Sequence, residues 1–158
     1  MAYEKELAVL AAAYLIGTLN PAYLLGKVKG VDLRRKGEFK NYSASNIRSV
    51  LGWRLGIAVA AIDLLKGVAA ACLPIYLGLQ PVFAYAASAL VVIGHRFPFY
   101  LGFKGGKGVA AGSGAFGFLL LFRHNLFSLG FAVAFFVYAV AVSPKFRKRL
   151  LGFIGIKG

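Results

Sequence analysis

The sequence predicts an all-α protein, a polytopic integral membrane helix bundle with about five spanning segments. Hydrophobic residues make up 59% of the chain and charged residues only 15%, whereas soluble domains carry roughly a quarter charged residues. The apolar residues gather in five segments, and basic residues gather in the stretches between them. A length of 158 residues is typical of one domain, so we expect residues 1–158 to form a single membrane domain.

The formal net charge of +14 is compatible with two classes of partner. A strongly basic chain can bind nucleic acid. The long apolar segments favour a membrane instead, because they need lipid to cover them. We therefore expect membrane lipids as partners and no nucleic acid, and the sequence indicates no oligomeric state.

Five apolar segments can be placed along the chain. They cover residues 7–25, 55–79, 82–94, 109–122 and 126–142. A straight spanning helix needs about 20 residues, with a range of about 17–25, so the first, second and fifth segments are long enough. The third is long enough only if it continues past Pro98 toward Leu101. The fourth is short, which predicts a helix that is tilted, fused to its neighbour or partly inserted.

Polar residues interrupt the first two segments. Asn20 and Pro21 predict a bend in the first, because proline removes one bond of the helical ladder and Asn is polar at membrane depth. Asp63 and Lys66 in the second segment are three residues apart, so they share a helix face and can pair. Charges inside a spanning segment are costly and often functional, so a structural pair and a role in a site both remain open.

Positive charge alternates between the two sides of the predicted membrane. Residues 26–54 carry eight Lys and Arg against two acids, residues 94–108 carry three, and residues 143–158 carry five. The turn at Gln80 carries none, and the turn near His124 carries one. The positive-inside rule then places the N-terminus outside, the C-terminus in the cytoplasm, and the three basic stretches on one cytoplasmic face.

The five residues from Lys104 to Gly108 form the strongest candidate site. They contain three glycines and two lysines and directly precede a predicted helix. Glycine opens backbone conformations in which N–H groups converge on one point, and a helix N-terminus favours an anion. The pattern indicates a phosphate cradle at the membrane surface. The alternative is a flexible loop whose lysines only mark the cytoplasmic side.

The glycine spacing argues against a nucleotide-binding P-loop. That motif needs four residues between its first glycine and its Gly-Lys pair, followed by Ser or Thr. The spacing from Gly102 to Gly106 is one residue short, and Gly108 occupies the Ser or Thr position.

The first basic stretch, residues 34–48, mixes cations with small hydroxyl and amide side chains. Arginine offers two parallel N–H bonds to a phosphate, and Ser and Asn suit phosphate and sugar-alcohol oxygens. The stretch therefore predicts contacts with a phosphorylated polyol. The other interpretation is a solvated loop that binds anionic lipid head groups.

The two histidines predict neither a conventional acyltransferase base nor a metal site. A His with Asp five residues later would supply a base and the group that orients it. His95 is followed at that distance by Tyr100, and His124 by Leu129. Two His and one Cys make no metal cluster, so we expect no metal and no cofactor. His95 is expected to contact phosphate or to bind a carbonyl at a helix end, and His124 to be structural.

Four stretches of the sequence resemble the bacterial membrane glycerol-3-phosphate acyltransferases that use acyl-phosphate as donor, the PlsY family. They are Lys29-Gly30-Val31-Asp32-Leu33-Arg34, Asn41 through Asn46, Asp63-Leu64-Leu65-Lys66-Gly67, and Gly94-His95 through Gly108-Val109-Ala110. The likeness covers about residues 10–120, and the last stretch is the most specific. The resemblance implies a bundle of seven helices in the plasma membrane, with the N-terminus outside and the active site facing the cytoplasm.

The resemblance also implies a reaction and roles for individual residues. An acyl group passes from acyl-phosphate to the 1-position of glycerol 3-phosphate, giving lysophosphatidate and phosphate in phospholipid biosynthesis, and a substrate phosphate takes the proton. Lys107 and Arg48 are expected to be catalytic. Substrate binding is expected of Lys104, Gly105, Gly106, Gly108, His95, Asn41, Ser45 and Asn46. The glycine-rich N–H groups would stabilise the leaving group, and the apolar bundle would hold the acyl chain.

The sequence departs from the family pattern in two places, the first motif and the C-terminal motif. The family's first motif carries a serine that falls near Phe39 here and an arginine that falls on Ser49, with Arg48 one position early. The family's C-terminal His, Glu and Asn have no counterparts in residues 143–151, and about two helices are missing. These departures favour an alternative, a catalytically inactive PlsY-like membrane protein that binds phosphorylated lipid or an enzyme partner. A small anion transporter is disfavoured because no inverted repeat is visible.

Overall fold

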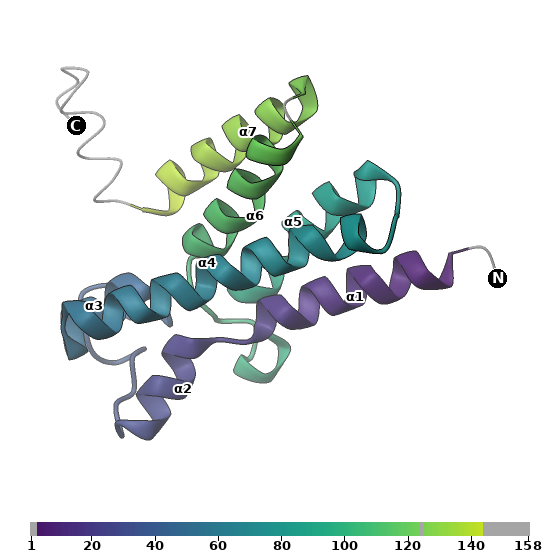
Figure 1. Ribbon diagram of the computed structural model, residues 1–158. Helices are drawn as coiled ribbons and strands as arrows, with labels where there is room; N and C mark the ends of the chain where they lie inside the picture. The colour runs from purple at the N-terminus through teal and green to yellow at the C-terminus, as the bar shows by residue number, and fades with distance from the viewer. Residues whose placement is uncertain (1–2, 124, 144–158) are drawn as a thin grey trace, which may run out of the picture.

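Every regular element in the described part of the chain is a helix (Figure 1). The structure is a computed structural model that describes residues 3–123 and 125–143. Its helices are α1 (Glu4–Thr18), α2 (Pro21–Val28), α3 (Ala44–Leu51), α4 (Trp53–Tyr76), α5 (Pro81–Arg96), a short 3-10 helix (Phe99–Leu101), α6 (Val109–Phe122) and α7 (Leu126–Val142). The expected all-α class is confirmed.

Three helical stretches are long and apolar enough to cross a membrane. They are Glu4–Val28, Trp53–Tyr76 and Pro81–Leu101. The third reaches Leu101 only together with the 3-10 helix that follows Pro98, because α5 itself ends at Arg96. The remaining apolar helices α6 and α7 have 14 and 17 residues, or about 21 and 26 Å at 1.5 Å per residue, which is less than the roughly 30 Å hydrocarbon core. The count of about five spans therefore stays a prediction.

Glycines allow two pairs of helices to approach closely. α1 lies along α5, and a Cβ on Gly17 would overlap the backbone carbonyl of Val91. α4 packs against α6 in the same way, because a Cβ on Gly67 would overlap the carbonyl of Ala111. Small residues at such contacts are typical of helix packing in membranes. The α4–α6 contact matters for function because it fixes the N-terminal half of α6.

The buried side chains form two clusters. One lies among α1, α4, α5 and α6 and includes Val91 and Leu119. The other lies at the end of the molecule that carries α2 and α3, and its largest fully buried side chains are Leu33 and Ile47. The second cluster gives the first basic stretch a folded core instead of leaving it as a solvated loop.

Helix α3 was not predicted from the sequence. Ser43 caps its N-terminus by accepting a hydrogen bond from the backbone N–H of Asn46, as N-cap serines commonly do. The helix has only eight residues, too few for an isolated helix to be stable in water. Burial of Ile47, which is 0% exposed, supplies the tertiary support that the sequence pattern did not reveal.

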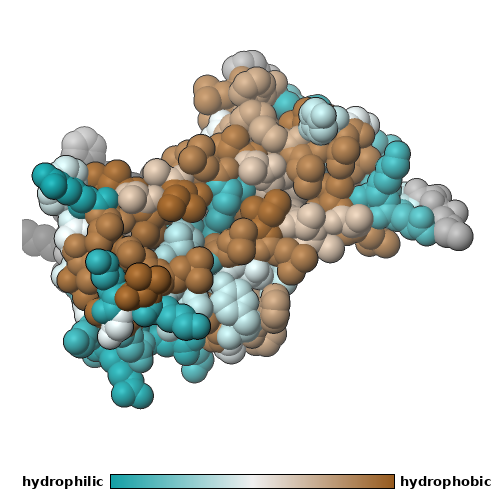
Figure 2. All heavy atoms as spheres, turned by 60° about the horizontal axis from the view of Figure 1, so that its bottom comes forward, coloured by the Kyte–Doolittle hydropathy of each residue, from teal (hydrophilic) through white to brown (hydrophobic). Residues whose placement is uncertain are grey.

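The surface divides into an apolar middle and hydrophilic ends. Figure 2 shows hydrophilic residues gathered at the end that carries α2 and α3, with hydrophobic residues over the helices beyond it. Many large apolar side chains are exposed, among them Leu126 at 83% and Leu65 at 63%. Contiguous apolar surface on this scale indicates contact with lipid or protein. The arrangement fits a helix bundle whose apolar middle is covered by lipid and whose ends are hydrophilic.

Candidate functional site at the glycine-rich stretch

The predicted break in the first segment is present between α1 and α2. Proline begins α2, and the Asn20 side chain caps this helix by accepting from the N–H of Tyr23 at 2.9 Å. The break leaves carbonyls at the end of α1 without helical partners. The Lys66 ammonium on α4 donates to two of them, Gly17 at 3.1 Å and Leu19 at 2.6 Å.

Lys66 also pairs with Asp63, as the spacing predicted. Its Nζ lies 2.8 Å from Asp63 Oδ1, and both side chains are buried. The sequence did not reveal a third member, His95 on α5, whose Nδ1 lies 2.8 Å from Lys66 Nζ and 3.3 Å from Asp63 Oδ1. His95 is 2% exposed. It therefore belongs to a buried polar cluster of Asp63, Lys66 and His95, here called the buried triad.

The glycine-rich stretch lies directly against the end of α5. The N–H of Gly105 donates to the carbonyl of Arg96 at 2.9 Å, and the N–H of Gly106 donates to the carbonyl of His95 at 3.1 Å. The expectation that these two N–H groups point at a phosphate was therefore wrong in this structure. They satisfy the carbonyls at the C-terminus of α5, a normal role for glycine after a helix.

Both glycines are required by close contacts rather than by an unusual φ angle. A Cβ on Gly105 would overlap the carbonyl of His95, and a Cβ on Gly106 would overlap Nε2 of the same residue and the carbonyl of Tyr42. Gly106 is therefore enclosed between α5 and the first basic stretch. Any side chain at this position would push these two parts of the molecule apart.

The start of α6 keeps the features expected of an anion site. Gly108 is its N-cap with a φ of 74°, and no side chain caps the helix. The N–H groups of the first helical residues, Val109 to Ala111, precede the first intrahelical bond, which Gly112 donates to Gly108. Free N–H groups and the helix dipole favour an anion at such a terminus. The candidate anion site is therefore the first turn of α6, and not the N–H groups of Gly105 and Gly106.

The two lysines of the stretch are placed differently. Lys107 is half-buried, and its ammonium lies 3.8 Å from the centroid of the Phe39 ring. A cation over an aromatic face at this distance is held favourably. Lys104 is exposed. Lys107 is therefore the lysine whose position is set by the fold.

The first basic stretch contacts the loop that leads into the glycine-rich stretch. An Nη of Arg34 donates to the carbonyl of Leu101 at 2.8 Å, and its guanidinium lies 5.0 Å from the centroid of the Tyr42 ring. Burial raises the pKa of the Tyr42 hydroxyl, and the Arg34 charge partly opposes that shift. No individual role for Arg34 could be predicted from its neighbours in the chain, because only the fold brings Leu101 beside it.

Asn46 organises the first basic stretch. It is 0% exposed, and its Nδ2 donates to the carbonyls of Leu33, Lys36 and Asn41 at 2.8, 3.1 and 3.0 Å. Its Oδ1 accepts from the N–H of Phe39 at 2.9 Å. The side-chain amide is occupied by the protein, so this geometry supports an architectural role rather than the expected contact with substrate.

The other predicted residues of this stretch are more accessible. Asn41 and Ser45 are half-buried, and Asn41 Oδ1 accepts from Ser43 Oγ at 2.6 Å. Arg48 is exposed on α3, with its Cβ facing Gly56 of α4. Asn41 therefore directly precedes Tyr42, whose carbonyl lies against Gly106, and Arg48 is an exposed side chain on the side of α3 that faces α4.

Helix α7 closes the other side of the glycine-rich stretch. The Tyr138 hydroxyl donates to the carbonyl of Lys107 at 2.6 Å. Arg96 donates to the Tyr138 hydroxyl at 3.5 Å. The polar end of α7 thus fixes the residue that precedes the N-cap of α6.

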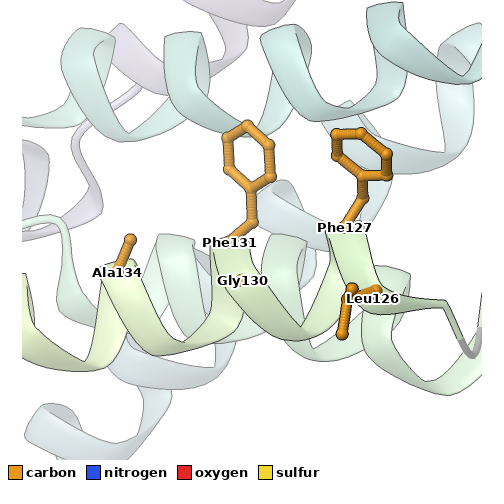
Figure 3. Close-up of a pocket in the computed structure, with 5 residues that line it drawn as sticks. All are labelled: Leu126, Phe127, Gly130, Phe131 and Ala134. Atoms are coloured by element: carbon orange, nitrogen blue, oxygen red, sulfur yellow. The ribbon is translucent and has the colours of Figure 1, made fainter.

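An apolar groove of about 460 Å³ runs between α6 and α7 from the start of α6. Its lining residues are Val109, Ser113, Phe116 and Gly117 on α6, Ala132, Phe135, Phe136 and Ala139 on α7, and Ser143 directly after α7. A larger apolar cavity of about 670 Å³ lies between α5 and α7 at the other end of these helices, beside Phe127 and Phe131. Figure 3 shows both rings projecting away from α7, and Phe131 stacks on Tyr85 of α5. Only the first groove begins at the candidate anion site.

Two expectations fall outside the described residues. His124 is one, and the basic tail at residues 144–158 is the other.

The chain is similar to proteins of one family. The sequence model of the family described as "Glycerol-3-phosphate acyltransferase" matches residues 7–154. The chain is 40% identical over 111 residues to the glycerol-3-phosphate acyltransferase of Geobacter metallireducens, which covers 70% of this chain and 57% of that protein. It is 40% identical over 131 residues to the one from Bacillus velezensis, which covers 82% of this chain and 65% of that protein. The chain therefore spans about six tenths of the length of these two relatives.

A solved structure has the same fold. It is a crystal structure of PlsY (YgiH), described as an integral membrane glycerol 3-phosphate acyltransferase in its glycerol 3-phosphate form. The TM-score is 0.75 at 26% identity, covering 94% of this chain and 92% of that chain. Together with the apolar helices, this likeness makes the chain a multi-pass membrane helix bundle. The family match over residues 7–154 and the shared fold show that the chain belongs to the PlsY family of glycerol-3-phosphate acyltransferases.

Proposed function

We propose that this chain transfers a fatty acyl group from acyl-phosphate to the 1-hydroxyl of glycerol 3-phosphate. The observation that carries the proposal is the uncapped N-terminus of α6 with Lys107 beside it, in a chain of this family. A helix N-terminus and an adjacent ammonium suit a phosphate. An acyl-phosphate is the donor that brings such a group to the reacting carbonyl.

In the proposed reaction the 1-hydroxyl oxygen attacks the acyl carbon. The bond from that carbon to the phosphate oxygen breaks, the hydroxyl proton passes to a substrate phosphate, and lysophosphatidate and inorganic phosphate are released. The first turn of α6 and Lys107 stabilise the charge that grows on the departing phosphate. Holding the hydroxyl beside an already activated acyl group supplies much of the rate.

Glycerol 3-phosphate is assigned to the first basic stretch. Asn41, Ser45 and Arg48 offer amide, hydroxyl and guanidinium groups that are exposed or half-buried, and Arg48 and the exposed Lys104 attract the substrate phosphate. Asn46 is assigned to holding this stretch in place. Gly105, Gly106 and Gly108 are assigned to shaping the turn that leads into α6. His95 on α5 is assigned to holding that turn in position.

The acyl chain is assigned to the groove between α6 and α7. This groove begins at Val109, next to the candidate anion site, and is almost wholly apolar. A donor bound with its phosphate at the start of α6 would place its hydrocarbon tail there, in the membrane. The basic stretches then face the cytoplasm, as charge alternation indicates. The family resemblance implies that the membrane is the plasma membrane.

The choice of acyl donor tests the proposal. Purified full-length protein should release phosphate from a long-chain acyl-phosphate in the presence of glycerol 3-phosphate, and should use acyl-CoA or acyl carrier protein poorly. A thioester donor has sulfur and not phosphate on its reacting acyl carbon, and the described residues offer no His-Asp base pair of the conventional spacing. Efficient turnover with a thioester and none with acyl-phosphate would refute the proposal.

A second function is favoured by the altered motif. The family serine falls near Phe39 and the family arginine on Ser49. These features support a catalytically inactive member that binds phosphorylated lipid or an enzyme partner. Such a protein would bind phosphate or lysophosphatidate and form no product from acyl-phosphate.

A further inference from the structure

We propose that Lys66 is a positioning residue for the glycine-rich stretch. With Asp63 it holds His95 neutral, with the proton on Nε2, and the His95 ring in turn sets the position of Gly106 and the start of α6. The inference rests on the proposed function only for its effect on turnover. Its structural part concerns one imidazole tautomer and can be measured without substrate.

The hydrogen-bonding rules for lysine fix the direction of the Lys66–His95 contact. An ammonium group has three N–H donors and no acceptor. Its 2.8 Å contact with His95 Nδ1 is a hydrogen bond only when Nδ1 accepts. The same Nδ1 lies 3.3 Å from Asp63 Oδ1, to which it could only donate, and we take the shorter contact as the hydrogen bond. A neutral imidazole that accepts at Nδ1 carries its proton at Nε2.

The charges of the buried triad support the neutral form. Asp63, Lys66 and His95 are 2, 8 and 2% exposed. The Asp63 carboxylate, 2.8 Å from Lys66 Nζ, balances the ammonium. A protonated His95 would add an unbalanced charge in a buried place, which is costly. Two opposite charges and a neutral ring are the balanced arrangement.

The contact with His95 is one of four around the Lys66 ammonium. The ammonium has two other partners in the carbonyls of Gly17 and Leu19, and a third in Asp63. With His95 Nδ1 there are four acceptors around three N–H bonds, so at least one N–H is shared between two acceptors. The contact with His95 Nδ1, at 2.8 Å, is as short as the one with Asp63 Oδ1, so we count His95 among the acceptors that the ammonium serves.

His95 transmits this orientation to Gly106 in two ways. Its carbonyl accepts the N–H of Gly106 at 3.1 Å. Its ring stands with Nε2 where a Cβ on Gly106 would lie, beside the carbonyl of Tyr42. Gly106 is two residues before Gly108, the N-cap of α6. A rotation of the ring would therefore move the residues that present the α6 terminus to a phosphate.

The first measurement is the tautomer of His95 in the wild-type protein. The chain has two histidines, so ¹⁵N NMR of histidine-labelled full-length protein in detergent gives two ring systems, and His124→Gln assigns them. We expect His95 to be neutral and protonated at Nε2 at neutral pH. Protonation at Nδ1, in the neutral or the charged ring, would overturn the inference without any variant of the triad.

The second measurement uses Lys66→Met, which removes the ammonium and keeps a similar volume. The Asp63 carboxylate then faces Nδ1 of His95, and we expect the ¹⁵N spectrum to show a proton at Nδ1. The affinity for inorganic phosphate and the turnover should fall by roughly 10- to 100-fold, as small displacements of a site can cause. Lys27→Met removes an exposed lysine from α2 and should leave the tautomer and the phosphate affinity unchanged.

The outcomes separate this inference from the proposed function. An unchanged tautomer and unchanged phosphate affinity in folded Lys66→Met protein would overturn the positioning role. If Lys66→Met does not fold, Asp63→Asn combined with Lys66→Met removes both charges, and a retained Nε2 tautomer with full phosphate affinity would again overturn it. A wild-type protein that shows the expected tautomer and phosphate binding but no turnover supports the inference and counts against the proposed acyltransfer.

Discussion

The N–H of Gly106 donates to the carbonyl of His95 at 3.1 Å, and the His95 ring occupies the space that a side chain on Gly106 would need. This contact joins α5 to the turn that leads into α6. The glycine-rich stretch is therefore a tightly packed connection, and its anion-binding groups lie at the first turn of the helix that follows.

Gly106→Ala should destabilise the protein and weaken phosphate binding. The new Cβ would overlap His95 Nε2 and the carbonyl of Tyr42, and overpacking of this kind costs about 1–3 kcal/mol. Gly106→Val should be more damaging, because a β-branched side chain needs more space. Thermal unfolding in detergent and binding of inorganic phosphate measure the two effects.

Gly130→Ala is the matched control. Gly130 lies inside α7 with open space at its Cβ position, so alanine should keep or slightly raise stability through its better helix propensity. Equal unfolding temperatures and phosphate affinities for Gly106→Ala and Gly130→Ala would show that the contact with His95 does not hold the site.

Lys107→Ala should weaken phosphate-dependent binding or turnover by about 10- to 150-fold, the equivalent of a charge-assisted contact of roughly 1.5–3 kcal/mol. Lys107 is half-buried beside the start of α6, where its charge adds to the helix terminus. Isothermal titration with inorganic phosphate and steady-state kinetics test the change. Lys27→Ala, on the exposed surface of α2, serves as the charge control. Equal effects of the two substitutions would mean that Lys107 does not bind phosphate and only marks the cytoplasmic side.

Asn46→Ala should lower stability more than it changes any direct substrate contact. Its amide serves the carbonyls of Leu33, Lys36 and Asn41, and each buried group left without a partner costs about 1–3 kcal/mol. Ser45→Ala, one position earlier in α3, leaves these bonds intact and should shift the unfolding temperature much less. A large loss of glycerol 3-phosphate affinity in Asn46→Ala with normal stability would restore the role in substrate binding.

Gly117→Leu should narrow the range of acyl chains. Gly117 lines the α6–α7 groove with open space at its Cβ position, about 12 Å along α6 from Val109 at 1.5 Å per residue. The ratio of turnover with long-chain to short-chain acyl-phosphates should fall about tenfold or more, as loss of pocket space for a few methylenes implies. Gly130→Leu lies outside this groove and should keep the wild-type ratio, and a wild-type ratio in Gly117→Leu would place the acyl chain elsewhere.

The orientation of the chain can be tested by cysteine labelling in intact cells. In a Cys72→Ala background, Lys36→Cys in the first basic stretch should be shielded from an impermeant reagent, and Leu126→Cys should react from outside. Leu126 is 83% exposed at the start of α7, so access is not limited by burial within the protein. Labelling of both positions from one side would mean that α6 does not cross the membrane.

Local features of the sequence predicted much of the fold. The Asn20-Pro21 break follows from the missing proline N–H, and the Asp63–Lys66 pair follows from helical spacing. The apolar segments and the two facing basic stretches follow from hydropathy and charge. These features depend on residues near one another in the chain, so one sequence is enough to find them.

Contacts between distant residues explain what the sequence did not show. His95 joins Lys66 across 29 positions, which requires α4 and α5 to bring these side chains to the same level. The N–H groups of Gly105 and Gly106 bind α5 because the chain turns back at Pro98, and helix α3 depends on the burial of Ile47. No local pattern specifies any of these three contacts.

The formation of lysophosphatidate tests the central claim most directly. Purified full-length protein is incubated with a long-chain acyl-phosphate, with and without glycerol 3-phosphate, and phosphate and lysophosphatidate are quantified together. We predict phosphate release that depends on glycerol 3-phosphate, matches lysophosphatidate mole for mole, and is largely lost in Lys107→Ala. Folded protein that binds inorganic phosphate and forms no lysophosphatidate would contradict the account and favour the catalytically inactive alternative.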